Sequence, residues 1–277
     1  MLFVILYAMV YSTLLLNNYV LTTELNFHLI GIVSLISFFY RLRVYDELKD
    51  YKIDVINHPN RVLQSGKINL KSLVFVSFIL ILFELYWIIS IGIVSIITWL
   101  IAFVYSLLMR YEFFIPSVLK KSLFVYAFSH MIIMPLIIFW IWTSLSYSLN
   151  VESSIIYLLV LSLCSGFAFE IARKIFAKEN EMETKDSYSK ELGLKLSQLL
   201  VIILSTLLIG VLCLFFYKFQ MPIYYYIFNA IIYLWIVTSY IKTIKLPSEI
   251  LLRKNEKKVS IMMLASYMSI IIYTIFN

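Results

Sequence analysis

Nine long stretches of apolar residues follow one another along the chain. They run over about 2–22, 27–44, 71–90, 92–110, 121–146, 153–172, 194–217, 222–242 and 259–276. About 20 helical residues cross the ~30 Å hydrocarbon core of a bilayer. Lipid offers backbone groups no hydrogen-bond partner, so a spanning segment must satisfy them within its own helix. The pattern predicts an all-α, polytopic membrane protein of about nine transmembrane helices, with a single domain over 1–277.

The composition supports a membrane protein. Hydrophobic residues make up 62% of the 277 residues and charged residues only 14%, whereas a soluble domain carries roughly 25% charged residues. The chain therefore lacks the polar surface that would let it face water on all sides. The first apolar stretch has no basic residues before it and no small-residue cleavage site, so we expect a helix rather than a signal peptide.

Charged residues are confined to one side of the predicted bundle. Of the 23 Lys and Arg residues, all but Lys218 lie in or beside four segments, at about 45–70, 110–121, 172–195 and 243–258. Basic residues accumulate in cytoplasmic loops, so we expect a multi-pass protein of the cell membrane with these loops and the N-terminus in the cytoplasm. The net charge of +7 then describes a face beside membrane lipids and is no evidence for nucleic acid.

Acidic residues share this face, which topology alone does not explain. About thirteen of the 16 Asp and Glu lie among the bases of the four segments. We therefore expect a functional site here, in a cavity that the helices enclose and that faces the cytoplasm. No motif indicates an obligate protein partner.

Three aspartates after the second apolar stretch have helical spacing. Asp46, Asp50 and Asp54 recur every four residues, so on a helix they form one stripe that drifts by about 40° per step. Like charges on one stripe repel one another, so helix stability does not explain the pattern. Mg²⁺ binds one or two protein carboxylates and completes its shell with water and substrate phosphate. A cation site and a solvated helix face are both compatible with the stripe.

The surrounding residues resemble a known family. Asp46-Glu47-x-x-Asp50-x-x-x-Asp54 is followed by Ile56-Asn57-His58-Pro59-Asn60-Arg61 and by Ser65-Gly66-Lys67-Ile68. This segment is similar to the first aspartate-rich motif of the UbiA superfamily, which are intramembrane prenyltransferases with nine helices. That motif begins Asn-Asp-x-x-Asp-x-x-x-Asp. The chain departs from it at Asp46 and Glu47, and both changes keep an oxygen ligand.

The resemblance is weaker at the family's second motif, an Asp-x-x-x-Asp after helix 6. Glu170 stands for the first Asp, but Lys174 occupies the place of the second, and Glu179 and Glu183 follow with i, i+4 spacing. Three interpretations remain open. The carboxylates are relocated, or Arg173 and Lys174 replace one metal and bind phosphate directly, or the site no longer performs the chemistry.

A basic motif after the fourth stretch is also incomplete. Tyr105-Ser-Leu-Leu-Met109-Arg110 resembles the family's Tyr-x-x-x-Lys-Arg, with Met109 in place of the Lys. Arg110 remains as a candidate phosphate ligand. Two ionisable residues, Glu84 and His130, lie inside apolar stretches, where such groups mark candidate functional sites or serve helix packing.

The resemblance implies a Mg²⁺-dependent prenyltransferase. It moves an isoprenyl group from a prenyl diphosphate to a hydrophobic acceptor, which is aromatic or lipid-like, within the membrane lipids. The implied catalytic residues are Asp46, Asp50, Asp54 and Glu170. The implied metal ligands are Asp46, Glu47, Asp50, Asp54, Glu170, Glu179 and Glu183, and the implied diphosphate ligands are Arg61, Lys67, Arg110, Arg173 and Lys174.

Two alternatives use the same fold. In a terpene cyclase, the substrate's own double bonds capture the cation. In a non-catalytic binder or transporter of polyprenyl phosphate lipids, no bond is broken.

Overall fold

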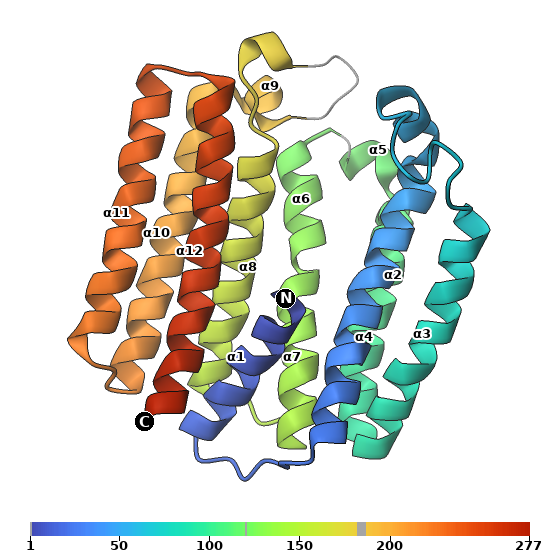
Figure 1. Ribbon diagram of the computed structural model, residues 1–277, viewed down its shortest axis with the longest axis vertical. Coiled ribbons are helices and arrows are strands. Elements are labelled where there is room, and N and C mark those ends of the chain that lie inside the picture. Colours follow the sequence, from blue (N-terminus) through green and yellow to red (C-terminus); the bar gives the residue numbers. More distant parts are fainter. Residues whose placement is uncertain (1, 120, 182–186) are drawn as a thin grey trace.

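A bundle of long helices makes up this computed structural model, which describes residues 2–119, 121–181 and 187–277 (Figure 1). The described residues contain helices and loops and no strand. The helices are α1 Leu2–Leu16, α2 Leu25–Asn57, α3 Leu70–Ile91, α4 Ile93–Arg110, η1 Glu112–Phe114, α5 Pro116–Leu119, α6 Leu123–Met131, α7 Ile133–Ser146, α8 Ser153–Arg173, η2 Lys178–Asn180, α9 Tyr188–Leu192, α10 Leu194–Lys218, α11 Ile223–Lys245 and α12 Glu249–Phe276.

Eight spans in the described parts of the chain are long and apolar enough to cross a membrane. They are α2, α3, α4, α6 with α7, α8, α10, α11 and α12. The α6–α7 span is divided at Ile132, where the regular helix is interrupted. The predicted polytopic, all-α fold is confirmed.

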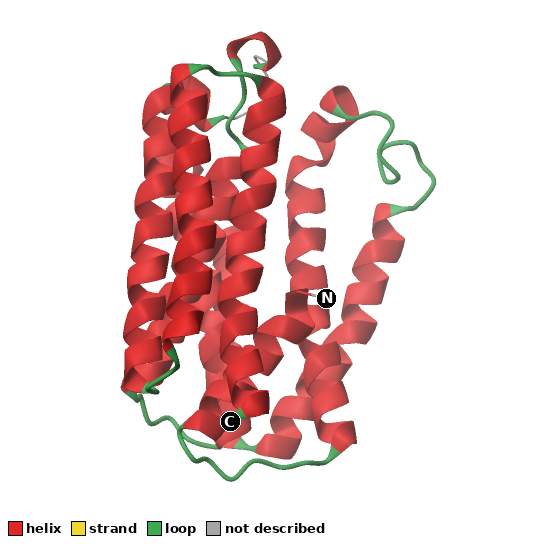
Figure 2. Cartoon of the chain, turned by 60° about the vertical axis from the view of Figure 1, so that its left-hand side comes forward, coloured by secondary structure: helices red, strands yellow, loops and turns green. Residues whose placement is uncertain are grey.

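The first helix is shorter than the sequence pattern indicated. We expected a span over 2–22, but α1 has 15 residues and is therefore about 22 Å long. The chain begins near mid-height of the bundle in both views (Figures 1 and 2). Asn17 and Asn18 end the helix, because the Asn17 amide donates to the Thr13 carbonyl at 2.8 Å and Asn18 adopts a left-handed φ of 62°. Hydropathy alone does not detect such a stop.

Two of the expected cytoplasmic loops are largely helical. α2 has 33 residues, which is about 50 Å, so it extends past any bilayer core and carries the aspartate motif as helix up to Asn57. At the other charged segment, only residues 246–248 connect α11 to α12. The Ser248 side chain caps α12 by accepting from the Leu251 amide at 3.4 Å. The charged segments therefore have defined geometry.

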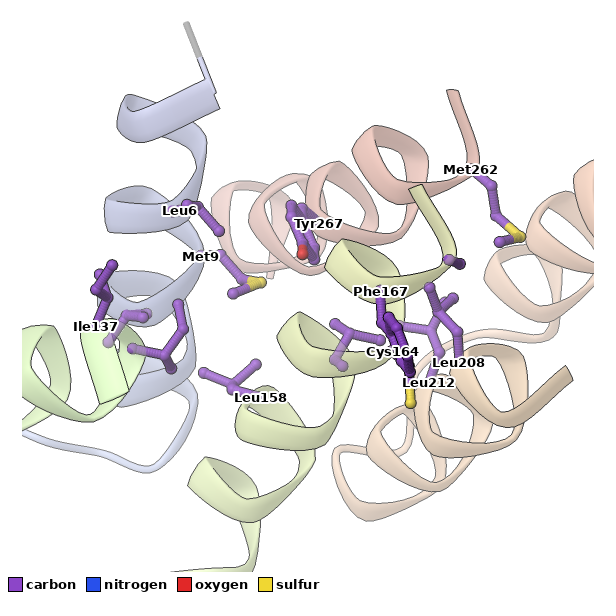
Figure 3. Packing of buried hydrophobic residues seen from close by; sticks show 14 of the residues in the cluster. Leu6, Met9, Ile137, Leu158, Cys164, Phe167, Leu208, Leu212, Met262 and Tyr267 are labelled. Carbon is purple, nitrogen blue, oxygen red and sulfur yellow. The ribbon is translucent and has the colours of Figure 1, made fainter. Parts of the chain in front are cut away.

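The buried core centres on α8, which packs against α7, α10 and α12. Figure 3 shows Leu158, Cys164 and Phe167 of α8 between Ile137 of α7 on one side and Leu208 of α10 on the other. Helices in lipid associate through close packing rather than through the hydrophobic effect.

A buried ion pair joins α2, α3 and α4. The guanidinium Nη1 of Arg41 lies 2.6 Å from Glu84 Oε1, and both side chains are almost inaccessible. The other Glu84 oxygen accepts from Trp99 Nε1 at 2.7 Å. Two phenyl rings, Phe38 and Phe103, flank the guanidinium with centroids 4.6 and 4.9 Å away. Glu84 is thus a helix-packing residue with several partners.

Candidate functional site

Three charged side chains share one face of the extended part of α2. Lys49 follows Asp46 by three residues, and its Nζ lies 3.9 Å from Asp46 Oδ1. The same ammonium donates to the Tyr126 hydroxyl of α6 and lies 5.2 Å from the centre of that ring. Asp50, one turn beyond Asp46, is half-buried and also interacts electrostatically with Lys49. This face of α2 is therefore turned toward α6.

The end of α8 carries one acid between two bases. Arg173 Nε donates to Glu170 Oε2 at 2.5 Å, and Lys174 Nζ lies 3.0 Å from Glu170 Oε1. The i, i+3 and i, i+4 spacings bring these side chains together on one helical turn. Glu170 is buried, whereas about half of the Arg173 side chain is exposed. The turn has a net positive charge, and Arg173 keeps donors available to a ligand.

The acids of α2 and the bases of α8 lie close enough to interact. Asp46 interacts electrostatically with Arg173, and Asp50 interacts with Lys174. We call the six side chains on these two helices the charged cluster: Asp46, Lys49, Asp50, Glu170, Arg173 and Lys174. The chain thus brings its two divergent motifs together from positions more than a hundred residues apart.

Other predicted site residues lie on a different side of α2. Glu47 pairs with Arg43 and accepts from Gln64 at 3.3 Å, and Asp54 pairs with Arg61 at 2.8 Å. Arg43, Glu47, Arg61 and Gln64 line a pocket of about 320 Å³ between α2 and the loop before α3. The stripe drifts by about 40° per step, so Asp54 is rotated by about 80° from Asp46. Asp54 thus pairs with Arg61 and still interacts electrostatically with Asp50 of the charged cluster.

The remaining predicted residues are scattered. Arg110 lies over the rings of Tyr45 and Tyr111, with centroids 5.1 and 5.3 Å away. Lys67 and Glu179 are exposed. Glu183 lies outside the described residues.

The carboxylates do not form a ready-made metal cage. Among the described residues, no three His, Cys, Asp or Glu side chains are grouped as metal ligands. Asp46 and Asp50 do match the one or two carboxylates that Mg²⁺ takes when phosphate and water complete its shell. Glu170 is already engaged by two cations. The charged cluster therefore offers two carboxylates one turn apart on α2 and two positive side chains at the end of α8.

Three residues at the site escaped the sequence analysis. Lys49 stands inside the motif, and its spacing from Asp46 would have placed it on the same face. Tyr126 carried no signal of its own. Tyr188 of α9 is fully buried near Glu170, and its hydroxyl has no hydrogen-bond partner in the described structure. Burial raises the pKa of Tyr188, so the hydroxyl stays protonated and able to donate.

Comparison with solved structures identifies the fold. One structure, described as "Structural and mechanistic insights into the biosynthesis of Digeranylgeranylglyceryl phosphate synthase in membranes", superposes with a TM-score of 0.71 at 21% identity, over 100% of this chain and 93% of that one. The apo structure of a UbiA homolog from Aeropyrum pernix K1 gives a TM-score of 0.73 at 10% identity, over 99% and 96% of the two chains.

These likenesses cover the whole chain, so the protein has the UbiA-type membrane fold, as the aspartate motif predicted. No protein-family model matches the chain, and no curated protein does.

Proposed function

We propose that the protein is an intramembrane prenyltransferase that transfers an isoprenyl group from a prenyl diphosphate to an aromatic or lipid-like acceptor. The observation that carries this proposal is the charged cluster, where acids of α2 face bases of α8 inside a UbiA-type fold. One fold relative is named as a synthase of a prenylated glyceryl phosphate in membranes, which supports a prenyl substrate.

The two halves of the charged cluster suit the two parts of a metal–diphosphate complex. Asp46 and Asp50 would hold Mg²⁺, which when bound offsets charge that develops on the leaving diphosphate. Arg173 presents a planar fork that matches phosphate oxygens, and Lys174 adds a point charge. Lys49 lies between the two aspartates and limits the repulsion between them. Binding, orientation and charge neutralisation thus come from side chains on two rigid helices.

The prenyl chain requires an apolar environment below this cluster. The buried core beyond it is rich in apolar and aromatic side chains, which would exclude water from a developing allylic cation and offer ring faces that attract it. Arg110, Arg61 and Lys67 lie at the charged end outside the cluster. We assign them to the approach of the diphosphate rather than to its final contacts.

Release of diphosphate tests the proposal. Purified protein is given geranylgeranyl diphosphate and Mg²⁺, with hydrophobic acceptors added singly. Asp50→Asn should abolish Mg²⁺-dependent diphosphate release and leave stability within ~0.5 kcal/mol, because a partly exposed carboxylate contributes little to folding. Glu152→Gln is the matched control, since Glu152 bonds Tyr19 at the other end of the bundle. Retained release in Asp50→Asn would contradict the assigned site.

Product analysis separates the alternatives that share the fold. A hydrocarbon formed from the diphosphate substrate alone would indicate a terpene cyclase. Tight binding of the prenyl diphosphate without any release by the native protein would indicate a non-catalytic lipid binder.

A further inference from the structure

His130 of α6 carries a buried ring nitrogen with no partner. The side chain is 8% exposed, and Nε2 has no hydrogen-bond partner in the described structure. Its Nδ1 lies 2.8 Å from the Tyr126 carbonyl oxygen. A carbonyl only accepts hydrogen bonds, so Nδ1 holds the proton and Nε2 has a free lone pair. The ring therefore leaves Nε2 as the nitrogen that can accept a proton.

The position of His130 connects it to the charged cluster. Its ring stacks on Tyr126 with centroids 4.1 Å apart, and the Tyr126 hydroxyl accepts from Lys49. His130 also interacts electrostatically with Lys49 and Lys174. It follows Tyr126 by one helical turn, or about 6 Å, on a helix that starts at the charged end (Figure 1). His130 therefore lies one helical turn inside the charged cluster, next to the residue that contacts Lys49.

We infer that His130 Nε2 is the general base that deprotonates a hydroxyl-bearing acceptor, an inference that rests on the proposed prenyl transfer. The bond between prenyl C1 and the diphosphate oxygen breaks, and the diphosphate leaves with the electron pair. A bond forms between C1 and the acceptor oxygen, and the hydroxyl proton moves to Nε2. The imidazolium returns this proton to water when the ether product leaves.

The neighbouring groups suit this assignment. The Tyr126 carbonyl accepts from Nδ1–H, which orients the ring and stabilises the imidazolium that forms. Phe113 packs edge-on against the imidazole, with ring centroids 6.1 Å apart, and so helps to hold the ring in this orientation. Nε2 is a buried hydrogen-bond acceptor without a donor. Such an unsatisfied atom lowers the stability of the fold by about 1–3 kcal/mol, so packing alone does not explain a histidine at this position.

Two variants test the inference in the full-length protein with geranylgeranyl diphosphate and hydroxyl-bearing acceptors, an alkylglycerol phosphate and a para-substituted phenol among them. His130→Gln keeps a polar side chain of similar size and should reduce ether formation by about a hundred-fold or more, with unchanged binding of a non-hydrolysable prenyl diphosphate analogue. His130→Ala should regain transfer as imidazole is added. His28→Ala is the matched control, because both ring nitrogens of His28 are already bonded, to Tyr7 and Thr22.

The outcomes separate this inference from the proposed function. Ether formation that His130→Gln leaves unchanged would overturn the general base and leave the prenyltransferase intact. Loss of activity in His130→Gln together with loss of analogue binding would assign His130 to the structure of the site and overturn its role as a base. Absence of diphosphate release by the native protein with every acceptor would overturn both.

Discussion

At the scale of single residues, the end of α8 shows how a divergent motif can remain useful. Glu170 forms ion pairs with both Arg173 and Lys174, so its negative charge is neutralised within the same helical turn. A cation that bound Glu170 would have to displace at least one of these two side chains. The turn as a whole carries a net positive charge.

This arrangement predicts that Arg173 contributes directly to diphosphate binding. Arg173→Ala should weaken binding of a prenyl diphosphate analogue by roughly ten-fold or more, because a charge-assisted hydrogen bond contributes about 1.5–3 kcal/mol. Arg173→Lys should recover only part of the affinity. The lysine keeps the positive charge but lacks the planar fork of donors that the guanidinium presents to phosphate oxygens. Lys254→Ala on the exposed side of α12 serves as control. Equal affinity in Arg173→Ala and the native protein would leave only the ion pair with Glu170.

The candidate site residues came from helical spacing on α2 and, at α8, from the resemblance to the family's second motif. Asp46, Asp50, Arg173 and Lys174 were selected from two motifs, and the structure brings them together. Asp54 was selected from the same stripe but pairs with Arg61. Whether a residue of this stripe reaches a partner depends on where the neighbouring helices lie. A single sequence does not contain the positions of those helices.

At the scale of helices, the Arg41–Glu84 pair holds α2 against α3 and α4. Glu84 accepts from Ser37, Arg41 and Trp99, and so satisfies donors from two neighbouring helices. Gly31 shows the same closeness on α2, because an added Cβ would lie 2.7 Å from a Trp87 ring atom. This packing fixes the rotation of α2, and with it the face that carries Asp46, Lys49 and Asp50.

Removal of one partner of this pair should destabilise the bundle strongly. Glu84→Ala is expected to cost about 3–5 kcal/mol, because it leaves the buried Arg41 charge without compensation. The double variant Arg41→Met with Glu84→Leu should recover most of that loss, since apolar replacements of a buried pair are often neutral. Thermal unfolding in one detergent measures both. A small effect of Glu84→Ala would mean that water or lipid headgroups reach Arg41.

The pattern of apolar stretches predicted the helices better than their ends. Eight spans fall where hydropathy placed them, because lipid exposure leaves the backbone no alternative to helix. The end of α1 at Leu16 and the interruption at Ile132 depend on local hydrogen bonds instead. Asn17 and Pro135, which lie beside these two points, fall within apolar stretches. An average of hydropathy over a window of residues therefore does not reveal them.

At the scale of the whole molecule, the two ends of the bundle differ in chemistry. The end with α5, α9 and the α11–α12 connection carries the charged cluster, and the opposite end holds short connections such as residues 147–152 (Figure 1). The charged cluster is therefore reached from one end of the bundle. The lipid-facing sides between the two ends are apolar, with exposed residues such as Phe78 and Leu82 on α3.

This division predicts the topology in the cell membrane. Asn60, in the loop between α2 and α3, and Asn150, between α7 and α8, lie at opposite ends of the bundle. Single cysteines at these positions, with Cys164 and Cys213 replaced by Ala, should react with a membrane-impermeant maleimide from opposite sides of oriented vesicles. Because basic residues mark the cytoplasmic side, Asn60→Cys should label from the cytoplasm and Asn150→Cys from outside. Labelling of both from one side would contradict the span count, and the reversed pattern would place the charged cluster outside the cytoplasm.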